Sequence, residues 1–238
     1  ISIVDANTIW ATAYDGSGTA ANIQQFTKTI DGGVTWTPGN INIQNANLGI
    51  SMIHAESATK AWLAAYPNGA GQIGGIWITT NGGTTWTRQN TATFNNAASF
   101  TNAVYFWNEL EGVCMGDPIN NEFEIYRTTN GGTTWTLVSG ANIPNPQANE
   151  FGYTRQMEVV GNSVWFGTSK GRIYYSSNKG QTWSVFTSPI TDFGGANVAS
   201  SSASMSFTST TNGMLVNQAG AIWTTTNSGS TWTPVTPT

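Results

Sequence analysis

Short apolar runs separated by polar turns recur along the chain at nearly equal intervals. Five apolar residues, Phe26, Ile76, Ile125, Ile173 and Ile222, each stand ten positions before a tryptophan and open a short run. Two further apolar runs lie upstream in each unit, for example 157–160 and 164–167 in the fourth. Because β-branched and aromatic residues favour strands, this pattern predicts a repeating unit of four strands.

The third run of each unit leads into one eight-residue motif, Ser/Thr-x-Asp/Asn-x-Gly-x-Thr-Trp, which we call the repeat turn. An Asp or Asn oxygen can accept backbone N–H groups, and Gly at the fifth position allows positive φ, so the motif predicts a tight hairpin turn followed by a buried ring. The tryptophans are 50, 49, 48 and 49 residues apart. The paired structural residues are Asp31 and Trp36, Asn81 and Trp86, Asn130 and Trp135, Asn178 and Trp183, and Asn227 and Trp232.

Four antiparallel strands repeated every 40–50 residues indicate an all-β chain, a β-propeller of four-stranded antiparallel blades. The motif resembles the Asp-box (BNR) repeat of sialidases, and its form at 79–86 and 128–135 is similar to photosystem II assembly factor-like proteins and to proteins exported by Bacteroidetes. We expect one domain over 1–238 with blades at 1–43, 44–93, 94–142, 143–190 and 191–238. No strand is left over to join the first and last blades, so either side-chain packing closes the ring or the chain belongs to a larger propeller.

The loops predict where binding occurs. In such a blade the A–B and C–D turns lie on one face, and the B–C and D–A connections lie on the other. We take Trp10, Trp62, Val113, Trp165 and Leu215 as equivalent strand-B positions; the following repeat-turn tryptophan is then 26, 24, 22, 18 and 17 residues away. From each of these tryptophans to the next strand B the distances are 26, 27, 30 and 32. Variable loops on a rigid scaffold commonly carry binding residues, here 15–24, 67–75, 89–102, 116–124, 139–156 and 186–204.

Charge and hydropathy exclude some classes of binding partner. The net charge is −4 and only 8% of residues are charged, which leaves no electrostatic footprint for nucleic acid. No apolar run approaches the ~18 residues of a spanning helix, so we expect no direct membrane insertion. A chain with 36 Thr and 25 Asn but few Lys favours export to the cell surface or the extracellular space.

Cys114 and His54 are the single Cys and the single His of the chain, so they provide neither a disulfide nor a Cys/His metal site. Ligand binding or catalysis would therefore depend on oxygen and guanidinium groups. We therefore expect no cofactor and no metal of that kind. The segment 116–124 is rich in carboxylates and Asn, which can hold Ca²⁺ or sugar hydroxyls or simply form a solvated loop. The candidate ligand-binding residues on the variable face are Asp15, Tyr66, Asp117, Glu122, Arg155 and Arg172.

The resemblance also allows enzymes to be considered. Sialidases need three converging arginines, whereas this chain has four in all, of which only Arg155 and Arg172 are expected on the variable face. A glycoside hydrolase needs only two carboxylates, and Asp15, Asp117, Glu122, Glu150 and Asp192 are candidates. We expect a non-catalytic binding or assembly module for a surface glycan or a protein. The alternatives are a glycoside hydrolase and a self-assembling structural tile of a surface layer or filament.

Overall fold

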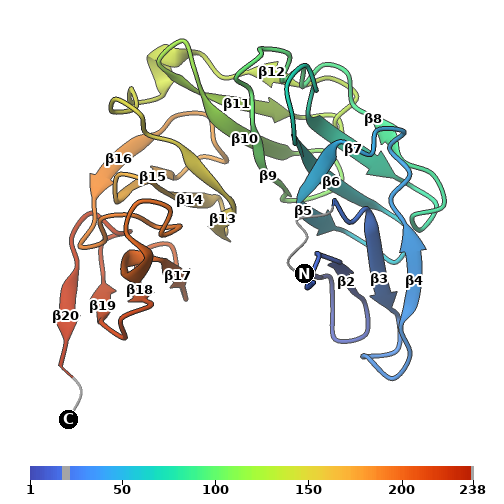
Figure 1. Ribbon diagram of the computed structural model, residues 1–238. Coiled ribbons are helices and arrows are strands. Elements are labelled where there is room, and N and C mark those ends of the chain that lie inside the picture. The colour runs from blue at the N-terminus through green and yellow to red at the C-terminus, as the bar shows by residue number, and fades with distance from the viewer. Residues whose placement is uncertain (18–21, 237–238) are drawn as a thin grey trace. The chain divides into compact units, whose positions relative to one another are not determined.

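The computed structural model describes residues 1–17 and 22–236, so residues 18–21 of the predicted loop 15–24 and residues 237–238 of the predicted fifth blade lie outside the described residues. These residues form five antiparallel four-stranded sheets, as the sequence predicts (Figure 1). In every sheet the four strands follow one another in chain order. Among the described residues, no helix is long and apolar enough to pass through a membrane.

The chain divides into two compact units, which are described separately. The first, Ile1–Ile119 with Glu124–Leu137, contains the first three sheets. The first sheet is β1 (Ser2–Ile3), β2 (Ile9–Thr12), β3 (Gln25–Thr29) and β4 (Thr37–Asn40). The second is β5 (Leu48–Ala55), β6 (Ala61–Pro67), β7 (Gly75–Thr79) and β8 (Thr87–Arg88). The third is β9 (Thr101–Phe106), β10 (Gly112–Ile119), β11 (Glu122–Thr128) and β12 (Thr136–Leu137).

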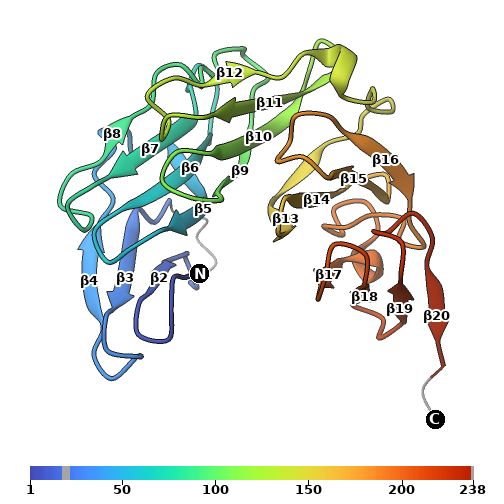
Figure 2. The same cartoon turned by 180° about the vertical axis from the view of Figure 1, so that it is seen from behind.

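The second unit, Asn120–Phe123 with Val138–Thr238, contains the fourth and fifth sheets, drawn in yellow to red in Figures 1 and 2. The fourth sheet is β13 (Gly152–Val160), β14 (Ser163–Thr168), β15 (Arg172–Ser176) and β16 (Ser184–Thr187). The fifth is β17 (Ala203–Phe207), β18 (Gly213–Asn217), β19 (Ile222–Thr225) and β20 (Thr233–Val235). Two single-turn 3₁₀ helices, Gly140–Asn142 and Ala199–Ser201, interrupt the segments between sheets.

The repeat turns share one set of hydrogen bonds. In the second sheet, the Thr79 hydroxyl accepts the N–H of Gly83 at 2.9 Å, and the Asn81 side-chain oxygen accepts the N–H of Thr85 at 3.0 Å. The other four turns repeat both bonds at 2.9–3.1 Å. The fifth-position glycines have φ between 75° and 91°, which confirms the predicted role of positive φ.

The sequence pattern missed the second left-handed residue of the turn. The fourth position also has positive φ, and in the fourth and fifth sheets it is occupied by Lys179 and Ser228 instead of glycine. Its N–H donates to a carbonyl of the A–B turn in the same sheet, as from Gly82 to Thr59 at 2.8 Å. The bond recurs in all five sheets at 2.8–3.0 Å and ties the two turns at that end of each sheet together.

Each repeat-turn tryptophan was predicted to be buried, and the structure bears this out for three of them. Trp86, Trp135 and Trp183 are 5–8% exposed, whereas Trp232 is half-buried. The prediction is wrong for Trp36, which is 43% exposed. The physical reason is that Trp86 packs in a hydrophobic cluster with residues of the sheet that precedes it in the chain, and no described segment fills that role for Trp36.

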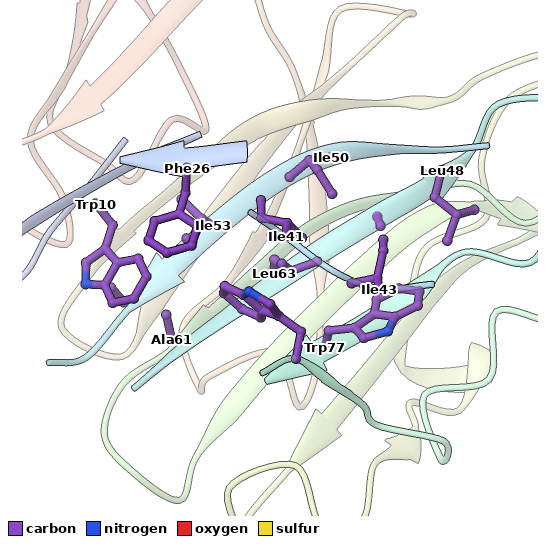
Figure 3. Close-up of a cluster of buried hydrophobic side chains, with 13 residues drawn as sticks. Trp10, Phe26, Ile41, Ile43, Leu48, Ile50, Ile53, Ala61, Leu63 and Trp77 are labelled. Carbon is purple, nitrogen blue, oxygen red and sulfur yellow. The ribbon is translucent and has the colours of Figure 1, made fainter. Parts of the chain in front are cut away.

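Neighbouring sheets within a unit pack through large apolar side chains. Trp10 and Phe26 of the first sheet share a cluster with Ile53 and Leu63 of the second (Figure 3). Trp62 of the second sheet stacks on Phe106 of the third, with ring centroids 3.6 Å apart. Such ring pairs combine a large buried apolar area with a defined geometry, so they fix how adjacent sheets pack.

Strand pairing corrects one predicted equivalence. Trp10, Trp62 and Trp165 each pair with the residue directly before a repeat turn, namely Lys28, Ile78 and Tyr175. In the fifth sheet the residue directly before the repeat turn is Thr224. It pairs with Met214 and not with Leu215. The sequence alignment was therefore out of register by one residue. Because side chains alternate between faces, the shift places Met214 and Leu215 on opposite sides of the sheet.

Candidate functional site

An ion pair in the fourth sheet brings together two residues that the sequence placed on the variable face. The Arg172 Nε donates to both carboxylate oxygens of Glu150, at 3.0 and 3.1 Å, and its Nη2 also contacts Glu150. Thr168 and the N–H of Gln147 supply two more donors, and the Glu150 side chain is fully buried. A buried carboxylate with this many partners anchors its loop and is not presented to a ligand.

Tyr174 extends this cluster. Its hydroxyl accepts from Arg172 at 2.7 Å and donates to the Pro144 carbonyl at 3.1 Å. Burial, reinforced by the negative charges of Glu150 and Glu122, raises the pKa of Tyr174 well above its usual value. Glu122 lies beside Gly140, and its Oε2 is buried without a hydrogen-bond partner among the described residues. The structure thus places Glu122 and Arg172 in one cluster, with most of the Arg172 side chain buried at 12% exposure.

Asp192, a predicted loop carboxylate, is buried inside its own loop. Its oxygens accept the N–H groups of Gly194, Gly195, Asn197 and Val198 at 2.6–3.4 Å, and the Tyr153 hydroxyl also donates to it. Although burial opposes ionisation, these donors hold the pKa of Asp192 below its usual value. The residue organises the segment that leads into the fifth sheet.

The predicted acidic loop 116–124 is not an open loop. β10 and β11 continue to Ile119 and from Glu122, and they are joined by Asn120 and Asn121, both at positive φ, in a two-residue hairpin turn. Glu124 is buried and accepts the hydroxyls of Ser99 and Tyr126 at 2.7 and 2.8 Å. Burial is the main cause that raises the pKa of Tyr126 to about 12. No group of three or more His, Cys, Asp or Glu side chains within residues 1–17 and 22–236 is placed to hold a metal ion.

Two of the predicted residues lie near each other in the first unit. Tyr66 stacks on Phe100 at 4.6 Å between ring centroids, and the N–H of Asp117 donates to the Phe100 carbonyl at 2.9 Å. The Asp117 carboxylate accepts from the Asn102 amide at 2.7 Å. Asp15 is in the loop after β2, where it accepts the N–H of Ser17 at 2.8 Å. Each of these side chains is half-buried, and each has a partner within the unit.

The lone residues Cys114 and His54 are packed. Cys114 is fully buried in a hydrophobic cluster, which raises the pKa of its thiol. His54 lies 4.5 Å from the Tyr105 ring, and burial lowers its pKa to about 4. Arg88 was not expected on the variable face, but it donates to the carbonyls of Gly74 and Thr93 in the connections at that end of the second sheet.

Arg155 has a different environment and defines the candidate site. Between the pairs Gly152–Thr168 and Met157–Phe166, strand β13 has four intervening residues and β14 has one, so β13 carries a wide bulge. Arg155 lies in this bulge with φ 66° and is exposed. Bulges and left-handed non-glycine residues are enriched at functional sites because they re-aim a side chain at a local cost in energy.

A small polar cavity of about 140 Å³ adjoins this bulge within the second unit. It is lined by Arg155, Gln156, Met157 and Glu158 from β13 and by Ser204 and Met205 from β17. Gln156 donates to the Ala203 carbonyl at 2.9 Å, and Glu158 accepts from the Ser206 hydroxyl at 3.1 Å and the Phe207 N–H at 3.0 Å. These bonds hold the cavity walls in place, while Arg155 provides a cationic donor at its edge.

Of the cavity residues, Arg155 alone was a candidate ligand-binding residue, although Gln156 and Ser204 lie within the predicted variable segments 139–156 and 186–204. Gln156 and Met205 have no motif, and they meet only because β13 and β17 are neighbours in the folded unit. The segment before the fourth sheet is long enough to include the bulge, so its length was a weak sequence signal for this site.

The sequence matches no protein-family model and no curated protein. Among solved structures, it is similar to an ancestral GH74 enzyme with a TM-score of 0.59 and 14% identity, covering 98% of this chain and 30% of that one. YCF48 from Cyanidioschyzon merolae gives 0.50 at 12%, covering 89% and 66%. A mutant of Trypanosoma rangeli sialidase displaying trans-sialidase activity gives 0.50 at 13%, covering 94% and 45%.

The five sheets are β-propeller blades. The likeness to these solved structures is one of fold, and the chain spans less than two thirds of the length of each of the three. Propellers serve unrelated functions on the same scaffold, so the function of this propeller has to be argued from its own residues.

Proposed function

We propose that this propeller is a non-catalytic binding or assembly module whose variable-loop face binds a surface glycan or a protein. We also propose that its repeat turns are Asp-boxes and that it is an exported, cell-surface or extracellular protein of the kind found in Bacteroidetes. The observation that carries the binding proposal is that Arg155 is exposed beside a polar cavity, whereas the loop carboxylates Glu150 and Asp192 are buried.

The same contrast argues against the hydrolase alternative. A glycosidase needs two carboxyl groups that reach the same sugar from ~5 to ~9.5 Å apart. Glu150 is occupied by Arg172 and Thr168, and Asp192 is occupied by four backbone N–H groups and Tyr153. Moving either carboxylate toward a sugar would leave its buried donors unpaired. Each unpaired donor would destabilise the fold by about 1–3 kcal/mol.

Binding can be tested on glycan and protein arrays with Arg155→Asn. Asn tolerates a left-handed backbone, so this substitution removes the guanidinium without straining the bulge. The matched control is Lys179→Asn, which removes one positive charge from a left-handed position in a repeat turn. We expect saturable retention that Arg155→Asn weakens at least tenfold and that the control leaves unchanged. An array without specific hits, or equal losses in the two variants, would contradict the proposal.

Glu150→Gln distinguishes a structural carboxylate from a catalytic one. Because Glu150 pairs with Arg172, the substitution should lower the free energy of unfolding and leave array binding unchanged. Release of reducing sugar from a polysaccharide by the unaltered protein, abolished by Glu150→Gln at a temperature where the variant is folded, would favour the hydrolase.

A further inference from the structure

The segments that link successive sheets fill a groove on the face of the next sheet. In the first unit, Ile41 and Ile43 follow β4 and share one hydrophobic cluster with Leu63, Ala65 and Trp77 of the second sheet (Figure 3). Both isoleucines are almost fully buried, at 1% and 7% exposure. An extended segment with two apolar residues thus completes the core of the sheet that follows it.

The same arrangement recurs wherever a linker is described between two sheets of one unit. Ala92 and Phe94 share a cluster with Cys114 and Tyr126 of the third sheet. In the second unit, Ile190 and Phe193 share a cluster with Leu215 of the fifth sheet. In the third sheet, the linker also forms hydrogen bonds with the repeat-turn tryptophan. The Trp135 indole donates to Gln89 at 2.8 Å, and its backbone N–H donates to Thr91 at 2.7 Å.

The first sheet has the same groove, but no described segment fills it. The groove has a volume of about 410 Å³, and Ala11, Ala13, Thr27 and Pro38 are among the residues that line it. Trp10 and Trp62 occupy equivalent positions in the first and second sheets, so the residues that follow them, Ala11 and Leu63, are equivalent too. Ala11 pairs with Thr27 on the next strand, and Leu63 pairs with Trp77 in the same way. The groove therefore occupies the position that Ile41 and Ile43 cover on the second sheet.

Apolar side chains elsewhere in the first sheet are exposed as well. Trp36 is 43% exposed, in contrast to its buried counterpart Trp86, and Ile3 and Val34 are 68% and 82% exposed. The position of Ile3, which pairs with Ile9, is taken in the second sheet by Ala55, which pairs with Ala61. Ala55 is buried, in contrast to the exposed Ile3. Solitary exposed apolar residues are common on proteins, but several large ones in a sheet that also has an unfilled groove are typical of an interaction surface.

We propose that the groove of the first sheet binds the linker of a further four-stranded repeat of the same kind. The occupant is a segment placed after a fourth strand, in which two apolar residues, at least one of them bulky, are separated by one or two positions. Its chemistry is that of the three linkers that fill the equivalent grooves. A repeat is favoured over an unrelated partner because similar solved propellers, such as YCF48 from Cyanidioschyzon merolae, extend beyond the part that this chain covers.

The test supplies such a repeat by duplicating residues 1–52 ahead of Ile1. In the extended chain, the added Trp36 position and the original Trp10 are 26 residues apart, the same interval as from Trp36 to Trp62. The added copy carries Trp36→Phe, so that oxidation by N-bromosuccinimide followed by peptide mass spectrometry reports only the original Trp36. We expect the original Trp36 to be oxidised at least tenfold more slowly than in the unextended chain.

The matched control carries Ile41→Asn and Ile43→Asn in the added copy alone and should lose this protection. Equal oxidation of Trp36 in the extended and unextended chains would overturn the proposal, as would full protection in the control. Protection that already exists in the unextended chain and rises with protein concentration would identify a second copy as the occupant and would also overturn it.

A substitution in the groove tests the same proposal by melting temperature, independently of tryptophan oxidation. Ala11→Arg should leave the melting temperature of the unextended chain within about 1 °C, because the groove is open there, and should lower that of the extended chain by several degrees. An equal loss in both chains would mean that Ala11 is packed by its own chain, which contradicts the proposal.

Discussion

The indole Nε1 of Trp165 in the fourth sheet donates a hydrogen bond of 2.8 Å to the carbonyl of Ser228 in the repeat turn of the fifth. Its ring also stacks on Phe207 of the fifth sheet, with centroids 4.0 Å apart and an interplanar angle of 9°. One fully buried side chain therefore joins two sheets by both packing and hydrogen bonding. The repeat turn is consequently part of the interface between sheets as well as a local hairpin.

Trp165→Ala should lower the free energy of unfolding by about 3–5 kcal/mol, because it empties a large buried volume and leaves a carbonyl unpaired. The matched control is Met214→Ala, since Met214 occupies the same strand position in the fifth sheet but is 46% exposed. That change should cost less than about 1 kcal/mol. Denaturant unfolding measures both, and equal losses would show that the interface does not depend on Trp165.

Thr79→Val tests the hydroxyl that opens a repeat turn. It keeps the side-chain shape but removes the acceptor for the N–H groups of Gly83, at 2.9 Å, and Asn81, at 3.4 Å. We expect a loss of about 1–3 kcal/mol in the free energy of unfolding. Thr79→Ser should be nearly neutral, since Ser176 accepts from Gly180 at 2.9 Å in the fourth sheet. A neutral Thr79→Val would mean that these bonds contribute little.

Gly171→Ala should be far more damaging than Gly220→Ala, although both glycines have positive φ, 66° and 83°. A Cβ at Gly171 would lie 1.8 Å from the Ile190 carbonyl oxygen, whereas one at Gly220 meets nothing within 4 Å. We expect about 1 kcal/mol for Gly220→Ala from backbone strain alone. Gly171→Ala should cost about 3 kcal/mol or more. Similar unfolding free energies for the two variants would show that the B–C turn and the following linker can separate freely.

The Asp31 carboxylate should make the first repeat turn sensitive to acid. Hydrogen bonds from Thr35, and a further one from Thr29, lower its pKa to about 2. Because the folded pKa lies below the ordinary value of 3.8, this contribution to stability is complete above pH ~4 and is lost as the pH falls through about 2. Asp31→Asn should remove this part of the acid dependence.

The other repeat turns have Asn at this position, so Asn81→Asp should introduce a similar acid-sensitive contribution in the second sheet. Urea unfolding at a series of pH values from 2 to 5 measures both changes, and carboxyl chemical shifts in NMR give the pKa directly. An Asp31 pKa near 3.8 would contradict the assignment of these bonds.

The repeat turns were predictable because each is a local structure. The Thr79 hydroxyl, the Asn81 side chain and the backbone they bond to lie within seven residues, so the sequence contains both partners. The four-strand order follows for a similar reason, since each strand pairs with the next one along the chain. The exposed Trp36 was not predictable from its motif, which matches that of Trp86, because burial of this ring depends on another sheet.

The candidate site was only partly predictable. Arg155 and Glu150 were both placed on variable segments, and nothing in the local sequence distinguishes an exposed guanidinium beside a cavity from a carboxylate consumed by Arg172. The length of the segment 116–124 suggested a loop, but the two asparagines at positive φ allow β10 and β11 to continue as a tight hairpin.

The sequence by itself determined the architecture, because an even repeat of four apolar runs and a turn motif specifies antiparallel four-stranded sheets through contacts between chain neighbours. Only the tertiary structure decided which side chains remain available for binding. Hydrogen-bond partners such as Arg172 for Glu150, and covering segments such as Ile41 and Ile43 for the second sheet, come from elsewhere in the chain. A motif read along the chain contains no information on those distant contacts, and burial and charge pairing depend on them.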